Sequence, residues 1–74
     1  MPALPVVSGR EAVGAFQKHG WEVARQRGSP IVLVKEGSIV SLSVPDHREV
    51  AKGTLRGLIR DAGITVEPFI KALD

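Results

Sequence analysis

Three basic side chains, Lys52, Arg56 and Arg60, recur every four residues in the carboxyl-terminal part of the chain. This spacing places them on one face of a helix, and no acidic residue stands four positions before any of them to relieve their repulsion. Backbone N–H groups at a helix N-terminus bind phosphate, so Lys52 together with Gly53 and Thr54 predicts a phosphate-binding site that the two arginines extend. The alternative is a basic face that is only solvated.

A second basic cluster lies in a predicted turn and consists of Arg25, Arg27, Gly28 and Ser29. Two guanidinium groups and the N–H groups of a turn can hold a phosphate between them. These four residues therefore join the candidate polyanion-binding set. The alternative is an ordinary turn whose surface arginines serve solubility alone.

Histidine is the side chain best suited to proton transfer near neutral pH, and the chain has two, His19 and His47. His19 stands at the end of a predicted helix, where a cation complements the helix dipole, so a structural role is favoured. His47 precedes the basic helix in an irregular loop, where it either bonds the backbone or transfers protons. The sequence has no metal-ligand spacing, phosphate-binding glycine loop or defensible Ser-His-Asp arrangement, so no metal and no cofactor are expected.

Composition restricts the class of protein. The chain has 74 residues, of which 43% are hydrophobic and 24% charged, as in a single globular domain. No apolar run approaches the roughly 18 residues of a membrane span, and the first residues lack the features of a secretory signal. The lack of cysteine is compatible with a cytoplasmic location. A net charge of +2 permits a nucleic-acid partner without requiring one.

Three short strands are predicted at residues 21–26, 31–36 and 39–44. The first turn spans residues 27–30, and Gly37-Ser38 is typical of a two-residue type II′ hairpin. The hairpin loop must contain an even number of residues, because a shift of one residue in the pairing would move every apolar side chain of the third strand to the other face. The predicted core face consists of Trp21, Val23, Ile31, Leu33, Val40, Leu42 and Val44, with Arg25 on the same side of the first strand.

The opposite face of the sheet is only half polar. It carries Ala24, Val32, Val34, Ser41 and Ser43. An apolar patch beside an edge strand suits a protein partner or a homodimer contact. The alternative is a scatter of surface valines, which is common in monomers.

The first helix is marked by capping residues. Ser8 and Glu11 form a capping box, and the helix is expected to run to about His19 and to end at Gly20 in a left-handed conformation. Gly14 inside this helix predicts a close approach to the sheet. Residues 1–7 contain two prolines and predict an extended, flexible lead-in.

The second helix has the clearest period in the chain, with Leu55, Leu58, Ile59 and Ala62 on one face. Thr54 is its expected N-cap and Gly63 its end. A short last helix follows after Thr65 and turns Phe69, Ile70 and Leu73 inward. The order of helix, three consecutive strands, helix and short helix predicts a three-stranded antiparallel sheet with helices packed on one face. The expected fold is a two-layer α+β domain, α-β-β-β-α(α), over residues 1–74.

The motifs, in this order, resemble the HicA family of bacterial toxins from about Ser8 to Leu73. They are Gly20-Trp21, Arg25-Gln26-Arg27-Gly28-Ser29, Val44-Pro45-x-His47, Lys52-Gly53-Thr54-Leu55, Ile59-Arg60-x-Ala62-Gly63-Ile64 and Glu67-x-Phe69. Each fragment alone is weak, whereas the ordered set is fairly specific. The resemblance implies a fold like the double-stranded RNA-binding domain, cleavage of mRNA and neutralisation by a HicB antitoxin. The basic residues above are then RNA-binding candidates.

One position departs from the family. The catalytic histidine of the family follows the Gly-Ser turn, where this chain has Pro30, which cannot transfer a proton. Cleavage without a metal requires a general base for the 2′-OH, and His47 is the hypothesised substitute.

Two alternatives to an RNA-cleaving toxin are a catalytically silent module that binds RNA or an antitoxin, and a small structural domain without a nucleic-acid partner. With only Trp21 and two Phe as aromatic residues, all at predicted core positions, contact with the RNA backbone is expected rather than base stacking.

Overall fold

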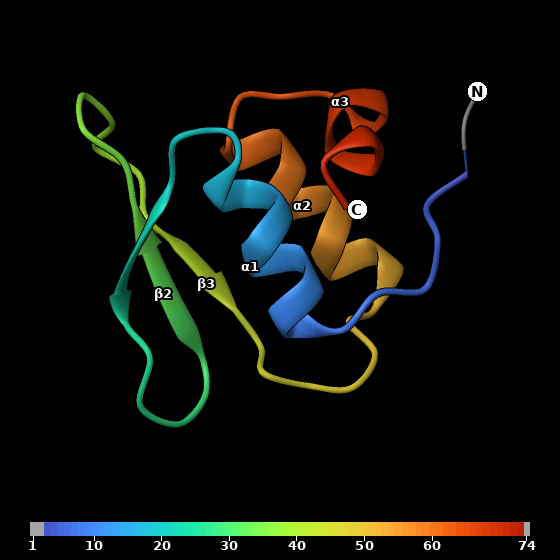
Figure 1. The fold of residues 1–74 in the computed structure, drawn as a ribbon, viewed down its shortest axis with the longest axis horizontal. Helices are drawn as coiled ribbons and strands as arrows, with labels where there is room; N and C mark the ends of the chain where they lie inside the picture. The colour runs from blue at the N-terminus through green and yellow to red at the C-terminus, as the bar shows by residue number, and fades with distance from the viewer. Residues whose placement is uncertain (1–2, 74) are drawn as a thin grey trace.

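The structure, a computed structural model, describes residues 3–73. Its elements are α1 (Gly9–Gln17), β1 (Glu22–Arg25), β2 (Ile31–Val34), β3 (Leu42–Val44), α2 (Lys52–Asp61) and α3 (Val66–Lys71). The strands form one antiparallel sheet in the order β1-β2-β3, and the helices lie on one side of it (Figure 1). The predicted α+β architecture is confirmed.

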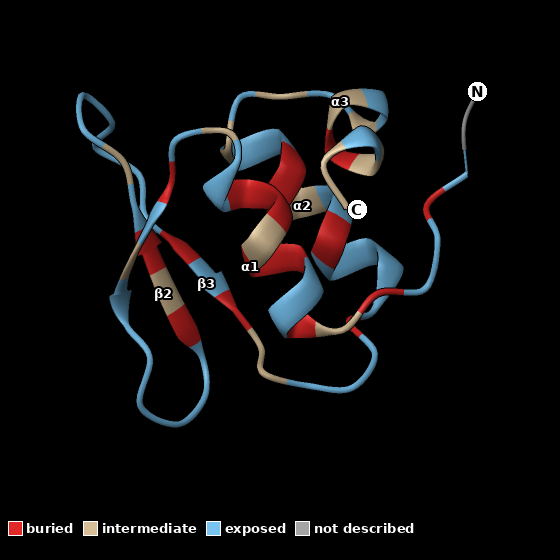
Figure 2. Cartoon of the chain, viewed as in Figure 1, coloured by how far each residue is buried: buried red, intermediate tan, exposed pale blue. Residues whose placement is uncertain are grey.

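The pairing of β2 with β3 is the one that the apolar pattern selects. Ile31 pairs with Val44 and Leu33 pairs with Leu42, and all four side chains are buried. Because antiparallel pairs share a face, this register collects them under the helices. The buried residues fill the space between sheet and helices, whereas the turns at both ends of β2 are exposed (Figure 2).

The hairpin between β2 and β3 differs from the prediction. The β2–β3 pairing ends at Leu33 and Leu42, and the turn is closed by a 3.0 Å bond from the Ser38 N–H to the Lys35 carbonyl. Gly37, at the third position of this turn, has φ +86°, as in a type II turn, so the predicted type II′ turn is wrong. The Ser38 hydroxyl accepts from the Val40 N–H at 3.1 Å and replaces a ladder bond there. Val40 is therefore 41% exposed and not a core residue.

A bulge in β1 corrects the predicted position of Arg25. Val23 pairs with Leu33 on the core face, but Arg25 pairs with Val32, so Ala24 is an extra residue. Arg25 consequently shares the outer face with Val32 instead of the core side with Val23. The extra residue removes a cation from the region that the helices cover.

The capping box at the start of α1 is confirmed. The Ser8 hydroxyl accepts from the Glu11 N–H at 3.1 Å, and the Glu11 carboxylate accepts from the Ser8 N–H at 2.8 Å. The helix ends at Gln17, two residues before the predicted limit, and Gly20 has φ +94° beyond it. A Cβ at Gly14 would meet nothing within 4 Å, so the predicted close approach there is wrong. The close approach is at Gly9, where a Cβ would collide with the Pro45 carbonyl oxygen.

The lead-in contributes to the core, which was not predicted. Residues 1 and 2 of the predicted flexible segment lie outside the described residues. Leu4 is 2% exposed and Val7 is 3% exposed, and the Val7 carbonyl accepts a 2.8 Å bond from the Val50 N–H. The other end of the core is closed by the rings of Phe16 and Phe69, whose centroids are 5.1 Å apart. No helix in the described part of the chain is long and apolar enough to span a membrane.

The two α1 glycines give a matched test of this packing. Gly9→Ala should lower the free energy of unfolding by about 1–3 kcal/mol, because the methyl group displaces the loop at Pro45. Gly14→Ala should raise it by about 1 kcal/mol, since alanine favours a helix interior and has open space there. Urea denaturation of both variants measures the effects. Equal changes in the two variants would contradict the proposed contact.

Candidate nucleic-acid interface

The two faces of α2 are chemically distinct, as predicted. Leu55, Leu58 and Ile59 are buried against the core. The three basic residues of the helix, Lys52, Arg56 and Arg60, are exposed. Burial of the leucine face fixes the rotation of the helix, so it also fixes the direction in which the basic face points. We call Lys52, Arg56 and Arg60 the basic ridge.

Acidic side chains of the protein neutralise little of the charge on the basic ridge. Arg60 Nε lies 3.7 Å from Asp61 Oδ1, but the side chains are 81% and 49% exposed, and such surface pairs contribute little. Lys52 and Arg56 form no ion pair with any other residue in the part of the chain that the structure describes. Two of the three cations are thus available to an external anion.

The amino-terminal end of α2 lacks a side-chain cap. Its N-cap is Ala51, so the prediction of Thr54 as N-cap is wrong. The first bond of the helix runs from the Leu55 N–H to the Ala51 carbonyl at 2.9 Å, which leaves the N–H groups of residues 52–54 without a partner inside the helix. The first turn contains no acidic residue either. Uncapped N–H groups and Lys52 together make this end favourable for an anion.

The second predicted cluster is an exposed turn between β1 and β2. Arg25, Arg27, Gly28 and Ser29 are all exposed, and Gly28 has φ +72°, which favours glycine. The Ser29 hydroxyl accepts a 3.2 Å bond from the backbone N–H of Asp46. This serine therefore ties the turn to the loop after β3, in addition to any contact with a ligand.

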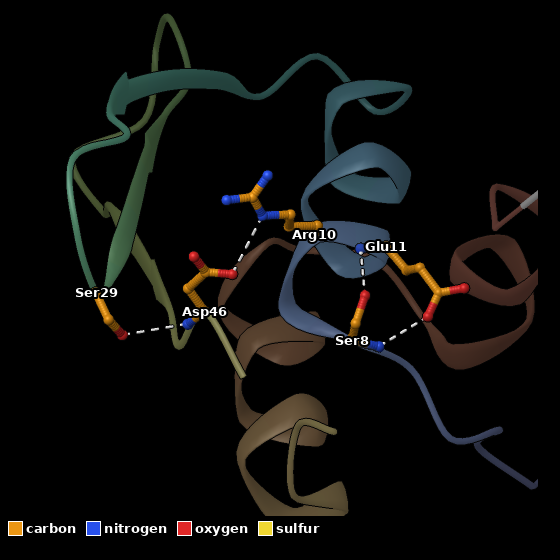
Figure 3. Close-up of polar contacts among 5 residues, drawn as sticks. All are labelled: Ser8, Arg10, Glu11, Ser29 and Asp46. Carbon is orange, nitrogen blue, oxygen red and sulfur yellow. Dashed lines mark hydrogen bonds and ion pairs between the residues drawn. The ribbon is translucent and has the colours of Figure 1, made fainter. Parts of the chain in front are cut away.

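Arg10 and Asp46 complete this connection and were not predicted. Arg10 Nε donates to Asp46 Oδ1 at 3.4 Å, so the loop at Asp46 is joined to both α1 and the β1–β2 turn (Figure 3). The register of the hairpin indicates one of these two contacts, the one between Ser29 and Asp46. Continuing the pairing of Ile31 with Val44 by two residues brings Ser29 opposite Asp46.

His47 lies next to this connection. Its side chain is exposed, and its backbone carbonyl accepts a 2.8 Å bond from the Gly9 N–H. Pro30 and His47 each neighbour one partner of the Ser29–Asp46 bond. The structure therefore brings the backbone of His47 near Pro30, the residue that stands where the resemblance places a catalytic histidine.

Most of the candidate residues gather at one end of the molecule. The β1–β2 turn, the loop of residues 45–51 and the N-terminal ends of α1 and α2 lie at the lower end in Figure 1. Arg60 is not part of this group, because it lies about 12 Å from Lys52 along the helix axis. The β1–β2 turn offers the exposed cations Arg25 and Arg27 to an anion, and the first turn of α2 offers Lys52 and the N–H groups that no side chain caps.

His19 does not belong to this arrangement. Its Nε2 lies 3.2 Å from the Pro68 carbonyl oxygen and links the turn after α1 to α3, in line with a structural role. Among residues 3–73, no group of three or more His, Cys, Asp or Glu side chains is arranged to hold a metal ion.

A family model described as the HicA toxin of bacterial toxin-antitoxin matches residues 9–64, well over half of the chain. The matched region runs from the start of α1 to just beyond α2 and contains every candidate residue named above. No curated protein and no solved structure matches the chain.

The missing cap at α2 leads to a stability prediction. Ala51→Ser should raise the free energy of unfolding by about 1 kcal/mol, because the hydroxyl can accept from an uncapped N–H group. Thr54→Ala should change it by less than about 0.5 kcal/mol, since Thr54 is exposed and caps nothing. Thermal or urea unfolding measures both. A larger loss from the Thr54 variant would mean that Thr54 is the cap.

Proposed function

The chain belongs to the HicA family, the toxins of bacterial toxin–antitoxin systems, and from this premise we propose that it acts by binding messenger RNA. The observation that carries the proposal is the basic ridge. A buried leucine face holds the ridge outward, and Lys52 and Arg56 have no acidic partner within the described chain. An antitoxin is the counterpart that membership of the family implies.

The proposed contacts are to the RNA backbone. Phosphates bind at the uncapped end of α2, along the ridge, and at the turn that contains Arg25, Arg27, Gly28 and Ser29. Backbone contacts fix the position of RNA without reading its sequence. A protein that binds messenger RNA in this way would act in the cytoplasm.

We further propose that His47 carries the proton transfer of RNA cleavage. A base must take the proton of a ribose 2′-OH so that this oxygen can attack the adjacent phosphorus, and an acid must protonate the leaving 5′ oxygen. Pro30 can do neither. The exposed imidazole of His47 stands one residue from Asp46, which bonds the turn beside Pro30.

A silent binding module is the second candidate, and Pro30 is the observation that favours it. Such a protein would hold RNA or an antitoxin without cutting a bond. Expression in bacteria discriminates the two: a nuclease arrests growth and leaves cleaved transcripts, whereas a silent module leaves transcripts intact.

The outer face of the sheet is the proposed contact with a HicB-like antitoxin. Val34 is 42% exposed there and Val32 is half-buried. A homodimer through the same face is less favourable than predicted from the sequence, because the bulge places Arg25 on it and a two-fold contact would repeat that charge. The mass of the purified protein in solution tests the dimer.

Removal of the ridge should weaken RNA binding. Lys52→Ala with Arg56→Ala should lower the affinity for any RNA sequence and reduce the slope of log affinity against log salt by about 1–2, because fewer counterions are released. Fluorescence anisotropy at several salt concentrations measures both quantities. The charge-matched control is Lys35→Ala with Lys71→Ala, which removes two cations from the hairpin turn and α3. Equal losses in the two double variants would show a response to net charge alone.

Removal of the imidazole should separate cleavage from binding. His47→Ala should abolish growth arrest and transcript cleavage. The RNA affinity in vitro should change by less than about twofold, because His47 is not one of the residues proposed to bind phosphate. The bond from the Gly9 N–H to the His47 carbonyl does not involve the imidazole, so the variant should keep it. Cleavage that continues at the original rate would exclude His47 as the catalytic base.

A further inference from the structure

A groove separates α1 from the first two strands. It has a volume of about 280 Å³ and is lined by Arg10, Val13, Gln17, Val23, Gln26 and Ile31. The three apolar residues are buried or half-buried and form its floor, whereas Arg10 and the two glutamines are exposed and form its rim. An apolar floor with a few convergent polar groups is the usual form of a small-molecule site.

The polar rim is chemically selective. Gln17 and Gln26 are the only glutamines of the chain, which has no asparagine, so every side-chain carboxamide in the protein lines this groove. Within residues 3–73 neither carboxamide has a hydrogen-bond partner. Arg10 is held by the bond from its Nε to Asp46, and its two terminal nitrogens point away from that carboxylate in Figure 3. Three planar groups with donors or acceptors to spare therefore surround the floor.

We propose that this groove binds one unstacked purine base of single-stranded RNA. Arginine and glutamine are the side chains that pair in bidentate fashion with purine edges, Arg with guanine and Gln with adenine. The aliphatic floor offers the apolar contact that an unstacked ring requires, in place of the aromatic residues that the surface lacks. A groove of about 280 Å³ lies just below the roughly 300–1,000 Å³ of drug-sized sites, which suits a single ring system.

The position of the groove fits the same RNA path. Gln26 stands between Arg25 and Arg27, which are proposed to hold phosphate, and Arg10 is bonded to the residue before His47. The groove thus begins at the end of the molecule where the candidate residues gather and extends along α1 to Gln17. This inference rests on the proposed RNA binding and adds to it the recognition of a base.

The experiment compares short 2′-O-methyl strands, which cannot be cut through the 2′ oxygen. Oligouridine and the same strand with one central purine are titrated into the full-length protein, with anisotropy as the readout. The wild type should bind the purine strand tighter by about fivefold or more. Gln17→Ala with Gln26→Ala should reduce this ratio to about one and leave the affinity for oligouridine within about twofold. Thr65→Ala, an exposed residue at the start of α3 that does not line the groove, should keep the ratio of the wild type.

A second measurement uses the two carboxamides directly. In an ¹⁵N spectrum of the protein, the carboxamide NH₂ signals come from Gln17 and Gln26 alone, because no other glutamine and no asparagine is present. Titration with adenosine or guanosine monophosphate should shift both pairs of signals, and uridine monophosphate should shift them less.

The outcomes separate the two proposals. Equal binding of both strands to the wild type, a pyrimidine preference, or an unchanged ratio in the glutamine double variant overturns the purine site and leaves RNA binding by the ridge intact. Failure of both strands to bind the wild type overturns the proposed function and the purine site with it. A purine preference that the glutamine variant abolishes supports both.

Discussion

The pairing of β2 with β3 is the constraint on which the rest of the structure depends. With Ile31 opposite Val44 and Leu33 opposite Leu42, the buried face of the sheet is set, and α1 and α2 must cover it. The same register continues beyond the ladder and brings Ser29 to the backbone of Asp46. A shift of one residue would expose the core face and also separate the β1–β2 turn from the loop that contains His47. Core and candidate site are therefore consequences of one alignment.

The second helix shows how stability and binding oppose one another in a small domain. Its leucine face is buried in the core, yet its N-terminus has no side-chain cap, no acidic residue and a lysine in the first turn. Each of these features disfavours the isolated helix. All three also favour an anion at that end. Packing of Leu55 and Ile59 offsets the local cost, so the helix can keep an end that is poorly satisfied without a ligand.

Much of this fold was predictable because it follows from periodicity and caps. The apolar pattern predicted the antiparallel sheet, its buried face and the leucine face of α2, and the Ser8–Glu11 box predicted the start of α1. The errors have local physical causes. Ser38 bonds Val40 and ends the ladder early, and Ala24 enters β1 as a bulge that turns Arg25 outward. The contact of Gly9 with Pro45 and the burial of Leu4 are long-range packing, which no local pattern reports. The candidate site was predicted as two separate clusters, whereas the structure joins the turn to the loop before α2 by the bond from the Asp46 N–H to Ser29, and joins that loop to α1 by the bond from Arg10 to Asp46.

The loop of residues 45–51 is fastened by its main chain. The His47 carbonyl accepts from the Gly9 amide, and the Val50 amide donates to the Val7 carbonyl. Neither bond involves a side chain, so mutation at positions 47–49 can alter the chemistry that the loop displays while its backbone path persists. Substitutions at these positions should therefore change the free energy of folding little. Relatives that share this backbone can gain or lose a reactive group here without acquiring a new fold.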